Sequence, residues 1–185
     1  MLRKIHQWAT GRNVLILIAA ELLFSIGVMP VVGQKMAAYA GGAGPIDLEI
    51  PTYTVDRAYE LLTAYGEEGR QFYKTIEISV DVVYPLIYGF AFAFALAFLW
   101  SRVAPGKRWA YYLPLLSLGS VLFDFLENAC IVTMLNNFPE RLTTVAQIAG
   151  VVSLIKWSLA FPTIALVLIG FIAWLIQLGR KKARA

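Results

Sequence analysis

Charged residues, histidine and cysteine are all scarce in this sequence. Asp, Glu, Lys and Arg make up 15% of the 185 residues, against about a quarter in a typical soluble domain. The single histidine, His6, lies near the N-terminus, which excludes a histidine-based metal or catalytic site in the apolar stretches that follow. The single cysteine, Cys130, excludes an internal disulfide and does not indicate a redox compartment.

Long apolar runs take the place of the missing charge, and hydrophobic residues make up 59% of the chain. A helix that crosses a bilayer needs ~20 mainly apolar residues. Four segments meet this requirement: 13–32, 76–100, 110–135 and 146–176. Short connections between the later segments favour antiparallel neighbours. The sequence therefore predicts a single all-α transmembrane domain, an integral membrane four-helix bundle with up-down-up-down topology.

The basic residues predict how this bundle is oriented. The formal net charge is +4, and ten of the sixteen Lys and Arg residues lie in three places. These places are the N-terminus, the second connection and the C-terminus, with Arg3, Lys4, Arg12, Arg102, Lys107, Arg108, Arg180, Lys181, Lys182 and Arg184. All three fall on one side of a four-span protein, so the positive-inside rule predicts a multi-pass protein of the inner (plasma) membrane with both termini cytoplasmic. The basic tail favours contact with anionic membrane lipids over nucleic acid, because no stacking aromatics are interleaved with it.

The N-terminal segment has a second interpretation. A basic start, an apolar stretch and the tripeptide Ala38-Tyr39-Ala40 follow one another in the order of a secretory signal peptide. However, the apolar stretch is long, contains Glu21 and ends several residues before that tripeptide. These features favour a first membrane span.

Residues 33–75 form the predicted extracytoplasmic loop. Its first part, 33–45, is rich in glycine and small residues, which is typical of a flexible loop. Thr54 indicates a helix start and Gly66 a helix stop, with leucines and tyrosines on one face between them. We expect a short amphipathic helix over 54–66 that covers the outer mouth of the bundle.

Ionisable side chains also lie within the predicted spans: Glu21, Glu77, Asp81, Asp124, Glu127 and Lys156. Such a residue costs about 2.5–3.5 kcal/mol at the bilayer centre on insertion scales, so it normally faces the bundle interior and pairs. With a rise of about 1.5 Å per residue, four helices bring these charges to a common layer in the outer half of the membrane. Asp124, Glu127 and Asn128 share one helical face, and Asp81, Tyr84 and Tyr88 share another.

Two hypotheses account for this layer. In the first, Lys156 neutralises Asp124 or Glu127, and the polar residues only hold the bundle together. In the second, the layer is a functional site, because one lysine cannot neutralise all the deep carboxylates, and some must stay protonated, bind a cation or face a wet cavity. The predicted ligand-binding or proton site consists of Asp124, Glu127, Asn128, Lys156, Glu21, Asp81, Tyr84 and Tyr88. Asp124 and Glu127 would be its functional acids, Asn128 an orienting donor and Lys156 the counter-ion.

The predicted function is the binding of a small or lipid-like ligand in this polar cavity, where the carboxylates could also transfer a proton. Two alternatives stay open: a membrane enzyme that uses the carboxylates for acid–base work on a lipid-like substrate, and a structural subunit of a larger membrane complex. No metal is expected, because Lys156 opposes a cation and the Glu-x-x-His motif of di-iron bundles is missing. No other cofactor is expected either, since there is no Gly-rich phosphate loop.

Three stretches resemble a recurring type of small bacterial four-span membrane protein. They are "AYELLTAYGEEGRQFY" (58–73), "DVVYPLIYGFAF" (81–92) and "FDFLEN" (123–128). The resemblance covers the middle half of the chain. It implies a shared membrane bundle and no activity, so none of the residue roles above depends on it.

Overall fold

The computed structural model describes residues 1–182, with the backbone alone for residues 181 and 182. Every regular element in this part of the chain is a helix, and no strand occurs in it. The predicted all-α fold is confirmed. Arg184, assigned from the sequence to the C-terminal basic group, lies outside the described residues, as do the side chains of Lys181 and Lys182.

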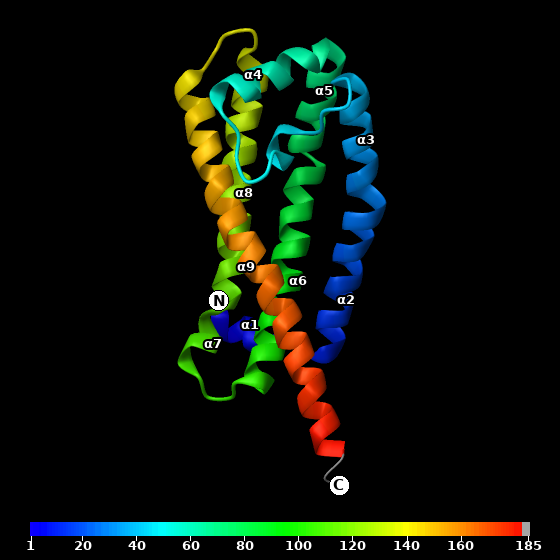
Figure 1. Ribbon diagram of the computed structural model, residues 1–185, viewed down its shortest axis with the longest axis vertical. Coiled ribbons are helices and arrows are strands. Elements are labelled where there is room, and N and C mark those ends of the chain that lie inside the picture. The colour runs from blue at the N-terminus through cyan, green and yellow to red at the C-terminus, as the bar shows by residue number, and fades with distance from the viewer. Residues whose placement is uncertain (183–185) are drawn as a thin grey trace.

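Four long helical segments form a bundle, and each runs opposite to the one before it (Figure 1). Their elements are α2 (Gly11–Leu23), a π-helical turn (Phe24–Val28), α3 (Met29–Tyr39), α6 (Val80–Val103), α7 (Arg108–Tyr112), α8 (Pro114–Asn137) and α9 (Thr143–Lys182). α2 continues through the π-helical turn into α3, and α7 continues into α8. All four segments are long and apolar enough to cross a membrane, which supports a multi-pass integral membrane protein with a four-helix bundle.

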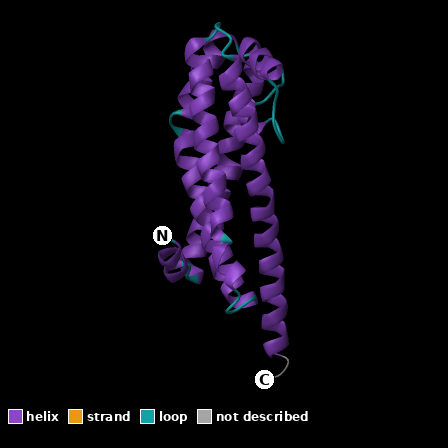
Figure 2. Ribbon diagram, turned by 90° about the vertical axis from the view of Figure 1, so that its left-hand side faces the viewer, coloured by secondary structure: helices purple, strands orange, loops and turns teal. Residues whose placement is uncertain are grey.

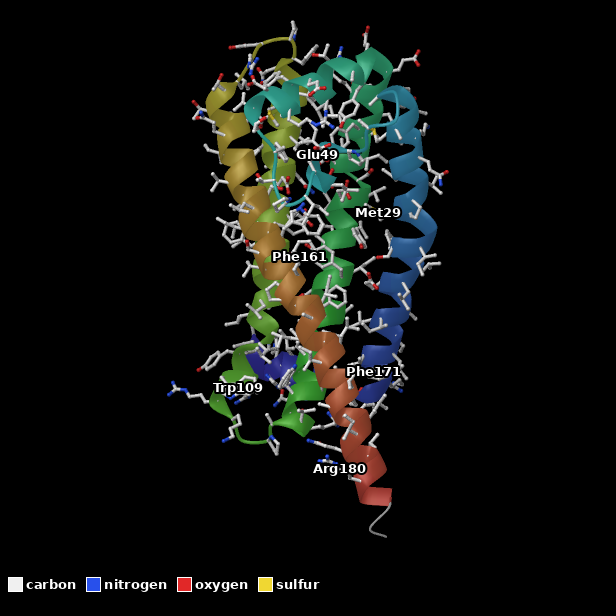
Figure 3. The ribbon with its side chains drawn as sticks, in the orientation of Figure 1. Met29, Glu49, Trp109, Phe161, Phe171 and Arg180 are labelled. Carbon is white, nitrogen blue, oxygen red and sulfur yellow. The ribbon has the colours of Figure 1, made fainter. Side chains whose placement is uncertain are left out.

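Large apolar side chains cover the outside of the bundle. Phe161 and Phe171 project from α9 (Figure 3) and are 48% and 46% exposed. Leu15 on α2 and Leu122 on α8 are similarly exposed, at 72% and 57%. Soluble monomers rarely expose so much contiguous apolar surface, so these faces fit contact with lipid.

The first two segments differ from the predicted spans at one end. The sequence predicts a span that ends at residue 32 and a flexible loop from residue 33, but α3 continues to Tyr39. The extension is stabilised by packing, because Met36 is fully buried and the Tyr39 ring contacts Phe72 with centroids 6.0 Å apart. The second segment begins at Val80 rather than at residue 76.

Two helices, α4 (Val55–Ala64) and α5 (Gly66–Glu77), lie across one end of the bundle (Figures 1 and 2). α4 begins as predicted, because the Thr54 hydroxyl accepts a hydrogen bond from the backbone N–H of Arg57 at 3.1 Å. Gly66 follows its end, but the sequence analysis missed that a second helix starts there. Gly66 has a φ of 63°, a left-handed conformation that favours glycine and lets α5 begin in a new direction.

Residues 45–53, which we call the strap, pack against the bundle below α4 (Figure 1). Ile46 is fully buried, and the Thr52 hydroxyl donates a hydrogen bond to the Gly150 carbonyl of α9 at 2.5 Å. Nothing in the sequence analysis predicts this segment as part of the interior. The strap places loop residues next to α9, and two of them, Asp47 and Leu48, line the candidate site.

The opposite end of the bundle carries the N-terminus, the last turns of α9 and the α6–α7 connection (Figure 1). There α1 (Leu2–Trp8) packs on α6, and Ile5 belongs to the same buried apolar cluster as Phe94 and Ala97. The described members of the three basic groups therefore gather at one end. This is the end that the positive-inside rule predicts to be cytoplasmic.

Candidate functional site

A partly open cavity of about 230 Å³ lies within the bundle beside the strap. Its polar lining consists of Glu21, Ser25, Asp47, Asp81, Tyr84, Tyr88, Ser120, Asp124 and Lys156. Its apolar lining consists of Met29, Leu48, Phe92, Trp157, Ala160 and Ile164. All the predicted site residues except Glu127 and Asn128 line this cavity. Four transmembrane segments and the strap thus contribute to one site.

Lys156 of α9 is the central cation and is 5% exposed. Its Nζ lies 2.5 Å from Oε2 of Glu127 and 3.4 Å from Oδ1 of Asp124, both on α8. It also donates a hydrogen bond to the carbonyl of Asp47 in the strap at 3.2 Å. One buried charge therefore joins α8, α9 and the strap.

Asp124 lies on the cavity wall between a cation and a hydroxyl. One carboxylate oxygen faces Lys156, and the other accepts a hydrogen bond from the Tyr88 hydroxyl at 2.7 Å. Ion pairing and a charge-assisted hydrogen bond both stabilise the ionised carboxylate. Asp124 is thus a fixed acceptor at the edge of the cavity.

Glu127 lies behind Lys156, away from the cavity, and is fully buried. Its contact with Lys156 is close but poorly directed, so neither carboxylate oxygen makes a regular hydrogen bond. The hydroxyls of Tyr53 and Ser153 lie near it. Glu127 therefore contacts Lys156 on the side away from the cavity and does not contact a molecule in the cavity.

Asn128 also lies outside the cavity. Its side-chain amide donates a hydrogen bond to the backbone carbonyl of Asp81 at 2.9 Å. This contact joins α8 to the first turn of α6 and thereby positions Asp81. The sequence predicts Asn128 as an orienting donor of the site. In the structure its side chain donates to the backbone of α6 and not to a group in the cavity.

Glu21 and Tyr84 form the wall on the side of the first segment. The Ser25 hydroxyl donates a hydrogen bond to Oε1 of Glu21 at 2.6 Å and lies 2.8 Å from the Tyr84 hydroxyl. The π-helical turn that begins at Phe24 contains Ser25, and such turns occur frequently at functional sites. Ser25 is not among the predicted site residues. The sequence signal for it is its position four residues after Glu21, one helical turn along the same face.

Asp81 is the least constrained acid of the cavity. It is 7% exposed, and its carboxylate has no hydrogen-bond or ion-pair partner within residues 1–182. A buried carboxylate without a partner is costly. Asp81 is therefore the acid most available to a molecule in the cavity.

The cavity lies where two parts of the bundle separate. The first segment packs on α6 and α5, whereas α9 packs on α8 and α6. Within the described chain the first segment makes no extensive contact with α9. Met29 lines the cavity on one side of this gap, and Ala160 and Ile164 line it on the other. The apolar part of the cavity thus faces the lateral surface of the bundle.

Asp47 in the strap belongs to the site although the sequence analysis did not select it. The Tyr73 hydroxyl donates a hydrogen bond to Oδ1 of Asp47 at 2.6 Å, and the Asp47 carbonyl accepts from Lys156. No local sequence signal could reveal this placement, because Asp47 and Lys156 are 109 residues apart. Residues 45–51 contain two carboxylates, Asp47 and Glu49, and the sequence does not distinguish the one that reaches the site.

Glu77, at the end of α5, lies outside the membrane-spanning helix that begins at Val80. It is 1% exposed, and neither carboxylate oxygen has a hydrogen-bond partner. Burial raises the pKa of Glu77 well above its ordinary value, and the negative charge of Asp47 adds to the shift. Glu77 therefore stabilises the folded chain best when it is protonated.

Glu77→Gln is expected to raise the melting temperature in detergent by a few degrees near pH 8 and to leave it unchanged near pH 4. The pKa of Glu77 is higher in the folded than in the unfolded chain. The pKa of glutamate in an unfolded chain is about 4.3. As the pH rises above this value, the Glu77 carboxyl group loses its proton first in the unfolded state, so the free energy of unfolding of the wild type falls. Glutamine does not titrate, so the difference between the two proteins should widen with pH.

Glu67→Gln, on the exposed first turn of the same helix, is the matched control and should change little at any pH. A Glu77→Gln difference of the same size across the whole range would contradict the raised pKa.

The side chains around Lys156 form a connected series of charged and hydrogen-bonding groups. Within the described residues, no group of three or more His, Cys, Asp or Glu could hold a metal ion. Tyr88, Asp124, Lys156 and Glu127 follow one another within contact distance. Tyr88, Asp124 and Lys156 of this series line the cavity with groups that carry a charge or an exchangeable proton, next to the aromatic rings of Tyr84 and Trp157.

The chain was compared with protein-family models, with curated proteins and with solved structures, and none of them matches it. The resemblance to a small bacterial four-span type therefore stays a prediction, and function has to be argued from the cavity itself.

Proposed function

We propose that the cavity binds a lipid-like molecule with a cationic head group. The observation that carries this proposal is the imbalance of charge on the cavity wall. Glu21, Asp81 and Asp124 line it, and the one cation, Lys156, already contacts both Asp124 and Glu127. A cationic group would supply the missing counter-charge, and the rings of Tyr84 and Trp157 would offer cation–π faces.

The apolar lining supports a ligand with a hydrocarbon portion. Met29, Ala160 and Ile164 line the cavity where the first segment and α9 separate. A molecule dissolved in the bilayer could enter through this gap with its apolar part toward lipid. The head group would then lie next to Asp81, whose carboxylate has no partner among residues 1–182.

Proton transfer to or from the ligand is the second candidate function. The Tyr88 hydroxyl already donates to Asp124 at 2.7 Å, and Lys156 lies 3.4 Å from the other oxygen. A carboxylate held ionised in this way could accept a proton from a ligand, or stabilise a positive charge that forms on it. This would make the protein an enzyme that acts on a lipid-like substrate.

A purely structural subunit would instead have a dry interior with every polar group paired. The buried oxygens of Glu77 and Glu127 and the indole N–H of Trp157 have no hydrogen-bond partner. Glu127 is still paired with Lys156, but the Trp157 indole and the Asp81 carboxylate lie on the cavity without a hydrogen-bond partner among residues 1–182. These two groups, together with the cavity, favour a binding role over a structural one.

Dodecylamine is the probe that tests this proposal, and dodecanol is its uncharged counterpart. In maltoside detergent, dodecylamine should raise the melting temperature of the wild type and dodecanol should not. Asp81→Asn should weaken dodecylamine binding tenfold or more. Truncating one partner of a buried charge pair costs about 2–5 kcal/mol, and about 1.4 kcal/mol corresponds to a factor of ten.

Glu60→Gln, which removes an equal charge from the exposed face of α4, is the matched control and should leave binding unchanged. Equal stabilisation by the amine and the alcohol, or an Asp81→Asn protein that binds as tightly as the wild type, would contradict the proposal.

A further inference from the structure

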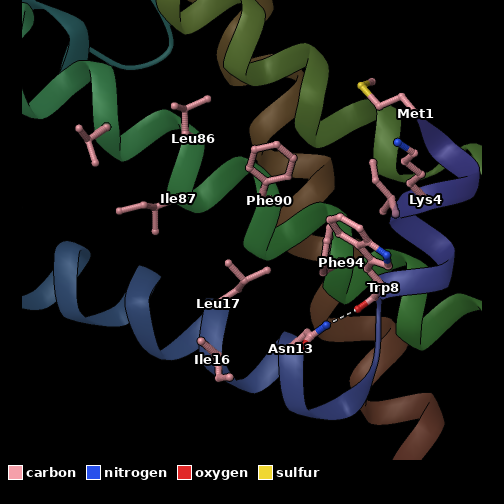
Figure 4. Close-up of a pocket in the computed structure, with 12 residues that line it drawn as sticks. Met1, Lys4, Trp8, Asn13, Ile16, Leu17, Leu86, Ile87, Phe90 and Phe94 are labelled. Carbon is pink, nitrogen blue, oxygen red and sulfur yellow. Dashed lines mark hydrogen bonds between the residues drawn. The ribbon is translucent and has the colours of Figure 1, made fainter.

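A second cavity lies between α1, α2 and α6 (Figure 4), and extends from α1, at the end of the bundle that carries the N-terminus, to Val83 near the start of α6. This groove has a volume of about 620 Å³ and is distinct from the acidic cavity. Its walls are apolar and are formed mainly by Ile16, Leu17, Leu86, Ile87, Phe90 and Phe94. It carries no carboxylate, so its ligand has a different chemistry from that of the acidic cavity.

The groove follows the membrane-spanning part of the chain. Its lining on α6 runs from Val83 to Phe94, a distance of ~16 Å at the rise of an α-helix. The first segment (Gly11–Tyr39), which begins with α2, and α6 both have the length and composition of membrane spans. The groove therefore lies along the hydrocarbon region, where an acyl chain is the natural occupant.

One end of the groove is basic. Among the described residues, Lys4 of α1 is the only charged side chain on its lining. Residues 1–20 contain no Asp or Glu. The Asn13 amide donates a hydrogen bond to the Trp8 carbonyl at 2.8 Å, which holds α1 over this end (Figure 4). Trp8 is 60% exposed, as expected for an aromatic residue at a membrane interface.

We propose that this groove binds one phospholipid with an anionic head group. Its acyl chain would lie between α2 and α6, and its phosphate would lie next to Lys4. Two features of the groove together select this occupant: apolar walls at membrane depth and positive charge without a compensating acid at the mouth. Basic pockets between membrane helices bind anionic head groups in this way.

The test is native mass spectrometry of the detergent-purified protein, titrated with phosphatidylglycerol or with phosphatidylcholine of the same acyl chains. The wild type should retain one phosphatidylglycerol more tightly than phosphatidylcholine. Lys4→Gln should weaken phosphatidylglycerol binding about fivefold, the effect of one basic residue near an anionic surface. Arg180→Gln, an equal charge loss near the C-terminus, should leave it unchanged.

A second variant tests the apolar part of the groove. Leu17→Trp would fill it, and the tight adduct should be lost; Leu122→Trp, on the exposed face of α8, should retain it. Equal affinity for the two lipids, or unchanged phosphatidylglycerol binding by Lys4→Gln, would overturn the proposal. Persistence of the adduct in a folded Leu17→Trp protein would overturn it as well.

Discussion

Lys156→Met is expected to lower the free energy of unfolding by about 3–5 kcal/mol, the usual cost of removing one partner from a buried ion pair. The substitution retains most of the side-chain volume, so the loss is mainly electrostatic. It would leave Glu127 and Asp124 without their cation and the Asp47 carbonyl without its donor. Reversible unfolding of the purified protein in mixed micelles would measure the change.

A compensating variant separates the charge effect from a packing effect. Adding Asp124→Asn and Glu127→Gln to Lys156→Met should recover most of the lost stability, because replacing a whole buried ion pair is often neutral. Lys107→Met, in the exposed α6–α7 connection, should change little. A loss below about 1 kcal/mol for Lys156→Met, the range of surface ion pairs, would show that Lys156 is not the centre of this network.

Gly150→Ala is expected to destabilise the fold by about 1–3 kcal/mol, the range for overpacking. A Cβ at this position would lie 2.6 Å from the backbone carbonyl of Tyr53, so the strap would have to move. The move would break the hydrogen bond from Thr52, worth about 1 kcal/mol. The higher helix propensity of alanine offsets about as much free energy as the loss of this hydrogen bond costs. The steric conflict therefore determines that the net change in stability is a loss.

Gly33→Ala is the matched control, because a Cβ there has nothing within 4 Å and the helix should become slightly more stable. Thermal unfolding would compare the two, and hydrogen exchange at residues 45–53 would report the displaced strap. Unchanged protection of these amides in Gly150→Ala would contradict the packing argument.

The sequence was sufficient to predict the elements whose signals are local. Apolar length predicted four membrane-type helices, and Thr54 predicted the start of α4. The common depth of the ionisable residues brought Glu21, Asp124 and Lys156 into one layer, and all three line one cavity.

Features that depend on contacts between distant residues were not predictable. Asp47 reaches Lys156 only because the strap packs on α9, and α3 continues to Tyr39 only because α5 lies beside it. Residues that share one helical face by their spacing can also point in different directions. Glu127 lies about 60° around the helix from Asp124, which is enough to turn it from the cavity to the back of Lys156.

The π-helical turn at Phe24–Val28 has a consequence for the periodicity of the first segment. At about 100° per residue, eight residues of α-helix would rotate Met29 by about 80° from Glu21. A π turn accommodates one additional residue, which reduces the difference to about 20°, so both side chains can line the same cavity. The first segment therefore follows two helical phases, one before Phe24 and one after Val28, and a single amphipathic pattern fitted across both would assign one half to the wrong face.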